Sequence, residues 1–190
     1  MKELLKENRI FTVPNFLTAF RILLIPVLMW LYIGRGCYLW ATVILVLSGA
    51  TDVIDGWIAR KFNAVTALGK ALDPFADKAT QLALLICLIS RWPHMICLLI
   101  IQVIKEAFVI TTSWMAAHAQ KYIKGAEWYG KLATVVLFFA ILPHIFWLNI
   151  PAWLSDTLIT LGIATATLAM VCYGIRNFRY IREAKSEQAK

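Results

Sequence analysis

The residues best suited to chemistry are four aspartates between positions 52 and 77. Asp52 and Asp55 are three residues apart, and Asp73 and Asp77 are four apart, so each pair lies on one face of a helix. If these two helices pack antiparallel, the four carboxylates converge and repel one another unless cations lie between them. A site made only of carboxylate oxygens suits Mg²⁺, Mn²⁺ or Ca²⁺ and does not suit zinc. The spacing therefore predicts a divalent-cation site between two helices.

The sequence around these carboxylates is typical of a membrane protein. Of the 190 residues, 61% are hydrophobic and 16% charged, and the mean hydropathy is +0.70. In soluble domains about 45–50% of the residues are hydrophobic and about 25% are charged. A single core in a chain of this size cannot bury so much apolar surface. Disorder is excluded because it requires low hydrophobicity. A carboxylate in a membrane helix costs about 2.5–3.5 kcal/mol, so four of them need one another, water or a cation as a partner.

We expect an all-α integral membrane protein with six transmembrane helices and an N-terminal amphipathic interfacial helix. Residues 1–13 alternate apolar and basic side chains, which predicts the interfacial helix. The apolar runs and their breaks predict spans at 15–34, 38–60, 69–90, 94–117, 128–148 and 153–175. Short loops indicate one domain over residues 1–190, with a cytoplasmic basic tail at 176–190. The charged N-terminus lacks the apolar core and cleavage site of a signal peptide, so none is expected.

The positive charges predict the orientation in the membrane. The net charge is +8, and all of the 19 Lys and Arg residues except Arg35, Arg91 and Lys105 fall on the side that holds both termini. By the positive-inside rule both termini are cytoplasmic, as in a bacterial inner-membrane protein. The charge lies between apolar runs, which indicates anionic lipid headgroups as partners and no nucleic acid. The four cysteines form no Cys-x-x-Cys pair and are expected to be apolar fillers.

Small residues accompany the carboxylates. The stretch reads Asp52-x2-Asp55-Gly56-x2-Ala59-Arg60-x8-Gly69-x3-Asp73-x3-Asp77. This pattern resembles, position for position, the motif of the CDP-alcohol phosphatidyltransferases. The run Pro14-Asn15-x2-Thr18-x2-Arg21 is similar to the start of the first span in that family, and the size and six-span pattern match as well.

The resemblance implies an enzyme that transfers the phosphatidyl group from CDP-diacylglycerol to an alcohol and releases CMP. It implies a two-metal site, with Mg²⁺ or Mn²⁺ held by the four aspartates, and a catalytic role for Asp77 as general base. It also implies a homodimer. The residues that would bind the nucleotide and the CDP-lipid are Asn15, Thr18, Gly56, Ala59, Arg60 and Gly69.

The second half of the chain is expected to select the acceptor alcohol. Its candidate acceptor-binding residues are Lys105, Glu106 and Lys131, together with Arg60 of the motif. The stretch LGKALDPFADK resembles the glycerophosphate-accepting bacterial members, so glycerol 3-phosphate is the preferred acceptor. Two positions depart from that subgroup, since Ala133 replaces a second lysine in the fifth span and Ser113 replaces an arginine late in the fourth.

Other interpretations remain open from the sequence. The cardiolipin synthases of this family, which use phosphatidylglycerol, also lack that second lysine, and an inositol phosphate acceptor is a further alternative. A divalent-cation transporter is the alternative from a different class. It would need polar residues across the bilayer, whereas the outer halves of these spans are almost wholly apolar.

Overall fold

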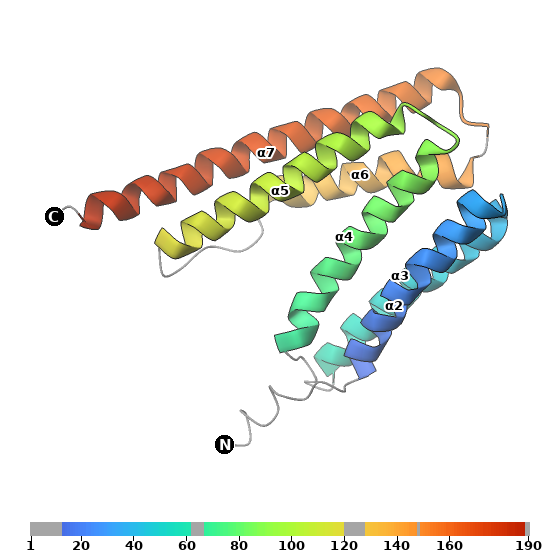
Figure 1. The fold of residues 1–190 in the computed structure, drawn as a ribbon, viewed down its shortest axis with the longest axis horizontal. Coiled ribbons are helices and arrows are strands. Elements are labelled where there is room, and N and C mark those ends of the chain that lie inside the picture. The colour runs from blue at the N-terminus through green and yellow to red at the C-terminus, as the bar shows by residue number, and fades with distance from the viewer. Residues whose placement is uncertain (1–12, 62–66, 120–127, 148, 189–190) are drawn as a thin grey trace. The chain divides into compact units, whose positions relative to one another are not determined.

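The computed structural model describes residues 13–61, 67–119, 128–147 and 149–188. Within these ranges every regular element is helical (Figure 1). The elements are α2 (Val13–Met29), a π-helical turn η1 (Trp30–Gly34), α3 (Tyr38–Lys61), α4 (Ala67–Ile89), α5 (Met95–Ala119), α6 (Trp128–Phe146) and α7 (Ala152–Gln188). They fall into two compact units, residues 1–90 and 91–190, which are described separately below.

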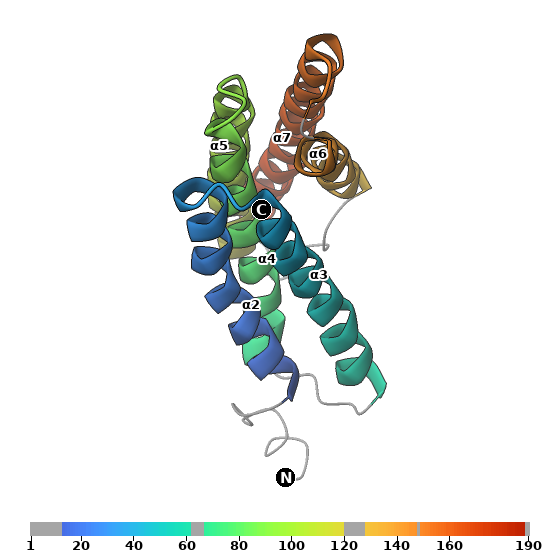
Figure 2. The same cartoon turned by 90° about the vertical axis from the view of Figure 1, so that its right-hand side faces the viewer.

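The first unit is organised around α2, which packs against both α3 and α4 (Figures 1 and 2). A tight turn joins η1 to α3, and Gly36 takes a positive φ of 63° there, which a residue without a side chain adopts at little cost. The Tyr32 and Tyr38 rings meet edge to face across this turn, with centroids 4.9 Å apart. The turn therefore sends α3 back antiparallel to α2.

The second unit is organised around α7, which packs against α5 and α6. Glycines on α6 and α7 allow close approach. A Cβ at Gly162 would lie 3.0 Å from the Leu98 side chain, and one at Gly130 would collide with the Tyr173 ring. At the other end of α6, the buried His144 ring contacts Ser155 of α7, with Nε2 2.8 Å from the Ser155 Oγ. Gly130 and the His144–Ser155 contact thus fix the pairing of α6 with α7, and Gly162 brings α7 close to α5.

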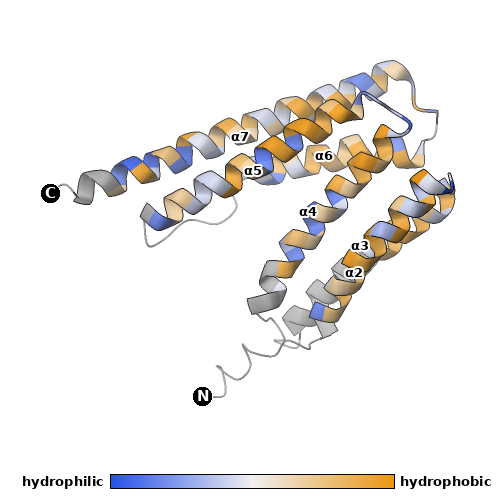
Figure 3. Cartoon of the chain, in the orientation of Figure 1, coloured by the Kyte–Doolittle hydropathy of each residue, from blue (hydrophilic) through white to orange (hydrophobic). Residues whose placement is uncertain are grey.

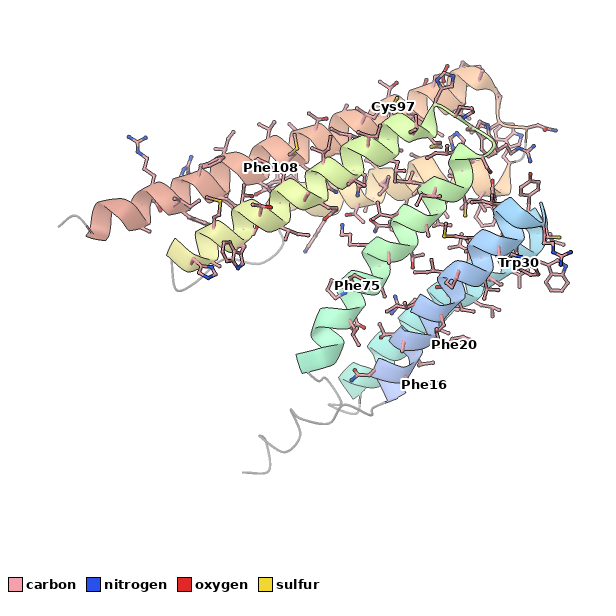
Figure 4. All side chains as sticks on the ribbon, viewed as in Figure 1. Phe16, Phe20, Trp30, Phe75, Cys97 and Phe108 are labelled. Atoms are coloured by element: carbon pink, nitrogen blue, oxygen red, sulfur yellow. The ribbon has the colours of Figure 1, made fainter. Side chains whose placement is uncertain are left out.

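Many large apolar side chains of these helices are exposed, as expected of a protein in lipid. Hydrophobic residues make up much of each helix (Figure 3). On α2 and η1, Phe16 is 71% exposed and Trp30 54% exposed, whereas the polar Thr18 is buried (Figure 4). Four described helices are long and apolar enough to cross a membrane: Asn15–Gly34, Met95–His118, Trp128–Phe146 and Ala152–Ala184. The chain is therefore an all-helical protein of membrane type.

Each of the six predicted spans coincides with a helix, but the six-span count itself stays a prediction. The described apolar part of α3, Tyr38–Thr51, is shorter than a span, and α4 is not among the four apolar helices because it carries charged residues. Residues 1–12 of the predicted interfacial helix lie outside the described residues. The predicted tail from residue 176 is helical as far as Gln188, since α7 continues through it without a break. The prediction of one domain is not tested.

Candidate functional site

Helix α4 carries two of the four predicted metal-binding aspartates. Asp73 and Asp77 lie one turn apart, so their carboxylates share a face of the helix. The Thr18 hydroxyl of α2 donates to Asp73 Oδ1 at 2.7 Å. The Gln81 amide nitrogen donates to Asp77 Oδ2 at 3.0 Å. Each carboxylate thus receives a hydrogen bond from a neutral donor, which helps to orient it.

The other half of the predicted site is on α3. The structure places Asp52 and Asp55 in the last turns of this helix, together with Gly56, Ala59 and Arg60. The side chains of residues 52–60 are outside the described part, so the convergence of the four carboxylates stays a prediction. Among described side chains, no group of three His, Cys, Asp or Glu residues gathers to hold a metal ion. The two described carboxylates are hard oxygen donors and fit Mg²⁺ or Mn²⁺ in kind.

A buried polar face on α2 lines the same unit. Asn15, Thr18 and Arg21 are spaced three residues apart, and all three are buried in a helix whose other faces expose large apolar side chains. This arrangement is the reverse of a soluble amphipathic helix, and it brings polar groups to the interior next to α4. The predicted nucleotide-binding residues Asn15 and Thr18 are on this face, and Gly69 is buried at the start of α4.

Two residues of this interior were assigned no role from the sequence. Arg21 completes the polar face of α2, and the repeat of polar residues at every third position was the available signal. Gln81 is 1% exposed and bonds to Asp77. Its position four residues after Asp77 was the corresponding signal, because such a spacing places the two side chains in reach.

The second unit carries a buried ion pair on α5. Lys105 Nζ lies 2.9 Å from Glu106 Oε1, with side-chain exposures of 7% and 21%. The buried Gln102 amide lies 3.4 Å from the same Glu106 oxygen, which makes a long contact. The structure therefore brings together two of the predicted acceptor-binding residues. Lys131, the third, is exposed in the first turns of α6.

Ser113, which stands where an arginine was expected, is part of a polar network between α5 and α7. The buried Asn177 amide donates to Thr112 Oγ1 at 2.9 Å and to Ser113 Oγ at 3.1 Å. The Arg176 guanidinium in turn donates to Asn177 Oδ1 from Nε at 3.1 Å and from Nη2 at 3.0 Å. It also lies over the Tyr173 ring, 4.8 Å from the centroid. A guanidinium from α7 is thus held in the network that contains Ser113.

Comparison with known proteins identifies the family. The model of the CDP-alcohol phosphatidyltransferase family matches residues 11–173. A Streptomyces coelicolor protein named cardiolipin synthase (CMP-forming) is 26% identical over 185 residues, which are 95% of this chain and 86% of that protein. A Haemophilus influenzae protein named CDP-diacylglycerol–glycerol-3-phosphate 3-phosphatidyltransferase is 32% identical over 137 residues, 69% of this chain and 74% of the relative. One of the same name from Sodalis glossinidius is 29% identical over 182 residues, 92% and 96% of the two chains.

Over its described residues the chain is helical and exposes large apolar side chains, as expected of a membrane protein. The chain belongs to the CDP-alcohol phosphatidyltransferase family. The prediction of an enzyme that transfers a phosphatidyl group in phospholipid synthesis is confirmed at the level of the family.

Proposed function

We propose that the chain transfers the phosphatidyl group of CDP-diacylglycerol to glycerol 3-phosphate, which yields phosphatidylglycerophosphate and CMP. The observation that carries this proposal is the pair of carboxylates on α4, the exposed Asp73 and the half-buried Asp77, each of which accepts a hydrogen bond from a buried neutral side chain. A fixed pair of carboxylates one turn apart suits a reaction in which positioning and charge stabilisation lower the barrier. Relatives with the glycerol-3-phosphate name match this chain over most of its length.

Asp52, Asp55, Asp73 and Asp77 would hold the divalent ions, Mg²⁺ or Mn²⁺. When bound, two such ions neutralise charge on the diphosphate and on the departing CMP. The chemistry of the donors supports this assignment, because Asp73 and Asp77 offer only oxygen and lie one turn apart on α4. Thr18 supports the geometry by fixing Asp73 from a second helix.

Other residues would bind and orient the CDP-lipid. Asn15 and Thr18 present polar groups from the buried face of α2. Gly56, Ala59 and Gly69 leave space for the nucleotide, and Arg60 would hold a phosphate oxygen of the lipid or of the acceptor. The acyl chains stay against the apolar exterior while the headgroup enters the interior.

Asp77 would act as the general base. It takes the proton from the acceptor hydroxyl as the hydroxyl oxygen forms a bond to the phosphorus of the phosphatidyl group. The bond from that phosphorus to the CMP oxygen breaks, and CMP leaves with the bonding electron pair. The half-buried position of Asp77 and its bond to Gln81 support this role, since a base must hold one orientation toward the hydroxyl.

Positive charge in the second unit supports a phosphorylated acceptor. Lys105, Glu106 and Lys131 are the proposed acceptor-binding residues with Arg60. The guanidinium of Arg176 adds a cation in the network of Ser113, the position at which the glycerophosphate subgroup is expected to have arginine. A dianionic phosphate is favoured by several such groups.

Phosphatidylglycerol is the second candidate acceptor. Two observations favour it: Ala133 is buried where the glycerophosphate subgroup is expected to have a lysine, and the relative named cardiolipin synthase matches 95% of this chain.

We further propose a homodimer in a bacterial inner membrane, with both termini in the cytoplasm, on the basis of the family and of the distribution of basic residues.

An acceptor panel tests the proposed function. The purified full chain in lipid nanodiscs receives CDP-diacylglycerol, Mn²⁺ or Mg²⁺, and glycerol 3-phosphate, phosphatidylglycerol or inositol phosphate, with lipid products identified by mass. We expect phosphatidylglycerophosphate and CMP, and no turnover after chelation with EDTA. Cardiolipin as the sole product would replace the first acceptor with the second, and turnover unaffected by EDTA would reject the metal site.

A further inference from the structure

A buried glutamine on α4 lies one helical turn after the proposed base and donates a hydrogen bond to it. Gln81 follows Asp77 by four residues and is 1% exposed. Its Nε2 lies 3.0 Å from Asp77 Oδ2, within the normal range for an N–H···O bond. Because a carboxylate only accepts hydrogen bonds, the nitrogen of the amide must face Asp77, and the amide orientation is fixed.

The carbonyl oxygen of this amide lacks a hydrogen-bond donor among the described residues. The Oε1 atom of Gln81 is buried, and no donor in the described part of the chain reaches it. A buried carbonyl oxygen without a donor is costly, and an Asp–Gln pair at this spacing adds only a little to helix stability. The stabilisation of α4 alone does not offset that cost. The surrounding buried residues Leu84, Leu85 and Leu88 show that an apolar side chain is compatible with this face of α4.

We propose that Gln81 is a positioning residue that fixes the plane of the Asp77 carboxylate for proton abstraction. The terminal torsion of an aspartate is soft, so a free carboxylate samples many planes. A bond that holds Oδ2 from the side facing away from the cytoplasm sets the direction of Oδ1. A neutral amide does this without an opposing charge, whereas a lysine or arginine would form an ion pair with the base.

Comparison with α5 supports a specific use for this bond. The second buried glutamine, Gln102, also stands four residues from a carboxylate, yet its distance to Glu106 Oε1 is 3.4 Å. Glu106 is bound instead by the Lys105 ammonium at 2.9 Å. The bond from Gln81 to the proposed base is thus the shorter of these two contacts between a glutamine and a carboxylate four residues away.

The inference rests on the proposed function, because it assigns Asp77 as the base. The test uses the full chain in nanodiscs with CDP-diacylglycerol, glycerol 3-phosphate and Mn²⁺. Gln81→Met keeps the length and removes the donor, and Gln81→Glu keeps the shape and replaces the donor with an acceptor oxygen. Thr80→Val is the matched control, because the Thr80 hydroxyl only returns to the Ala76 carbonyl of its own helix. The readouts are kcat, the KM for CDP-diacylglycerol, and the midpoint of thermal unfolding with and without Mn²⁺.

For Gln81→Met we expect kcat to fall by about 10- to 100-fold, the size of effect expected for a hydrogen bond to a charged group. The KM should stay within about threefold and the unfolding midpoint should not fall, because the orphan oxygen is removed as well. The Mn²⁺-induced rise of the midpoint should persist. Gln81→Glu should lose at least as much activity, and Thr80→Val should match the wild type.

Three outcomes would overturn the inference. If Gln81→Met or Gln81→Glu has the same kcat as the control Thr80→Val, the hydrogen bond from Gln81 to Asp77 is not needed for turnover. A fall in the unfolding midpoint of both Gln81 variants that accompanies the loss of activity would assign Gln81 a structural role. If the wild-type chain itself forms no phosphatidyl product with any acceptor, the proposed function fails, and the inference fails with it. Activity in the wild type together with an unaffected Gln81→Met variant rejects the inference alone.

Discussion

At the scale of single residues, neutral side chains donate to the two described carboxylates of α4, and a lysine forms an ion pair with the half-buried carboxylate of α5. Asp73 and Asp77 are bound by a threonine and a glutamine. Glu106 is bound by Lys105. The donors that orient the carboxylates thus differ between the two units. The two kinds of site therefore respond differently to substitution.

Asp77→Asn keeps the shape of the side chain and removes its ability to accept a proton. General-base catalysis typically contributes about 10²- to 10⁴-fold, so turnover should fall at least about a hundredfold. Binding of CDP-diacylglycerol should persist if the other three aspartates still hold a metal ion. Product formation by mass spectrometry and binding of a labelled CDP-lipid measure the two effects. Turnover close to that of the wild type would show that Asp77 is not the base.

Lys105→Met should destabilise the second unit. It removes the ammonium that lies 2.9 Å from the Glu106 carboxylate in an apolar helix. Loss of one partner of a buried ion pair costs about 3–5 kcal/mol, and the 21% exposure of Glu106 places this site near about 3 kcal/mol. The double variant Lys105→Met/Glu106→Leu should recover the unfolding midpoint in detergent without recovering activity. Equal midpoints for the wild type and the single variant would contradict this expectation.

At the scale of elements, each unit has one helix that contacts both of the others, α2 in the first and α7 in the second. The two central helices meet their neighbours differently. α2 presents a polar face, Asn15, Thr18 and Arg21, while α7 relies on small residues such as Gly162. The polar face orients groups near the proposed catalytic residues, and the glycines bring backbones close together.

Gly130→Ala should destabilise the packing of α6 on α7. The added Cβ would collide with the Tyr173 hydroxyl and lie 3.0 Å from two atoms of its ring. Overpacking of this kind costs about 1–3 kcal/mol. Tyr173→Phe in the same chain removes the closest atom and should restore part of the loss, as a double-mutant cycle on the unfolding midpoint would measure.

Gly49→Ala is the matched control for that experiment. Gly49 lies in α3, and a Cβ there meets no atom within 4 Å. Alanine is favoured over glycine inside a helix by about 1 kcal/mol, so this variant should be as stable as the wild type or more stable. A loss at Gly49 as large as that at Gly130 would mean that the effect does not come from contact with Tyr173.

Most of the helices could be predicted from the sequence because the apolar runs and their breaks are long and clear. Pro14, Gly36 and Pro93 mark ends that the structure reproduces within a few residues. The continuation of α7 through residue 176 could not be predicted, because the change from apolar to basic composition at that point marks a membrane surface and not a helix end. Arg176 is consequently a member of a packed network and not only of a basic tail.

The motif at positions 52–77 singled out four carboxylates, and the two described ones lie one turn apart on α4 as their spacing predicts, while their role stays a prediction. Their partners could not be predicted. Thr18 is 55 residues from Asp73, and only the packing of α2 on α4 brings them together. Gln81 was within reach of sequence reasoning, but a polar residue in an apolar run does not reveal whether it faces lipid or a carboxylate.

At the scale of the whole molecule, the single chain leaves much apolar surface uncovered. Side chains such as Phe16, Leu39 and Trp153 are at least 70% exposed. Exposure of such a large apolar surface to water is unfavourable, whereas contact with lipid chains or with neighbouring membrane helices is not. The exterior is therefore suited to the bilayer.

The loop between α6 and α7 tests this orientation. Asn149 is exposed there, and we expect it on the outer side of the membrane because both termini are proposed to be cytoplasmic. In a background without the four native cysteines, Asn149→Cys should react with a membrane-impermeant maleimide added to intact spheroplasts. Labelling of this cysteine only in inverted vesicles, in which the cytoplasmic face is accessible, would show that the topology is the opposite one.

The length of α7 has a mechanical consequence. Its 37 residues extend about 55 Å, whereas the hydrocarbon layer is about 30 Å thick. The segment after Arg176 therefore continues the same helix without a break. Its backbone orientation follows that of the turn that carries Asn177, which is bonded to Thr112 and Ser113. A helical protein joined in phase at Gln188 would hold a fixed orientation relative to α7, and a single added residue would turn it by about 100°.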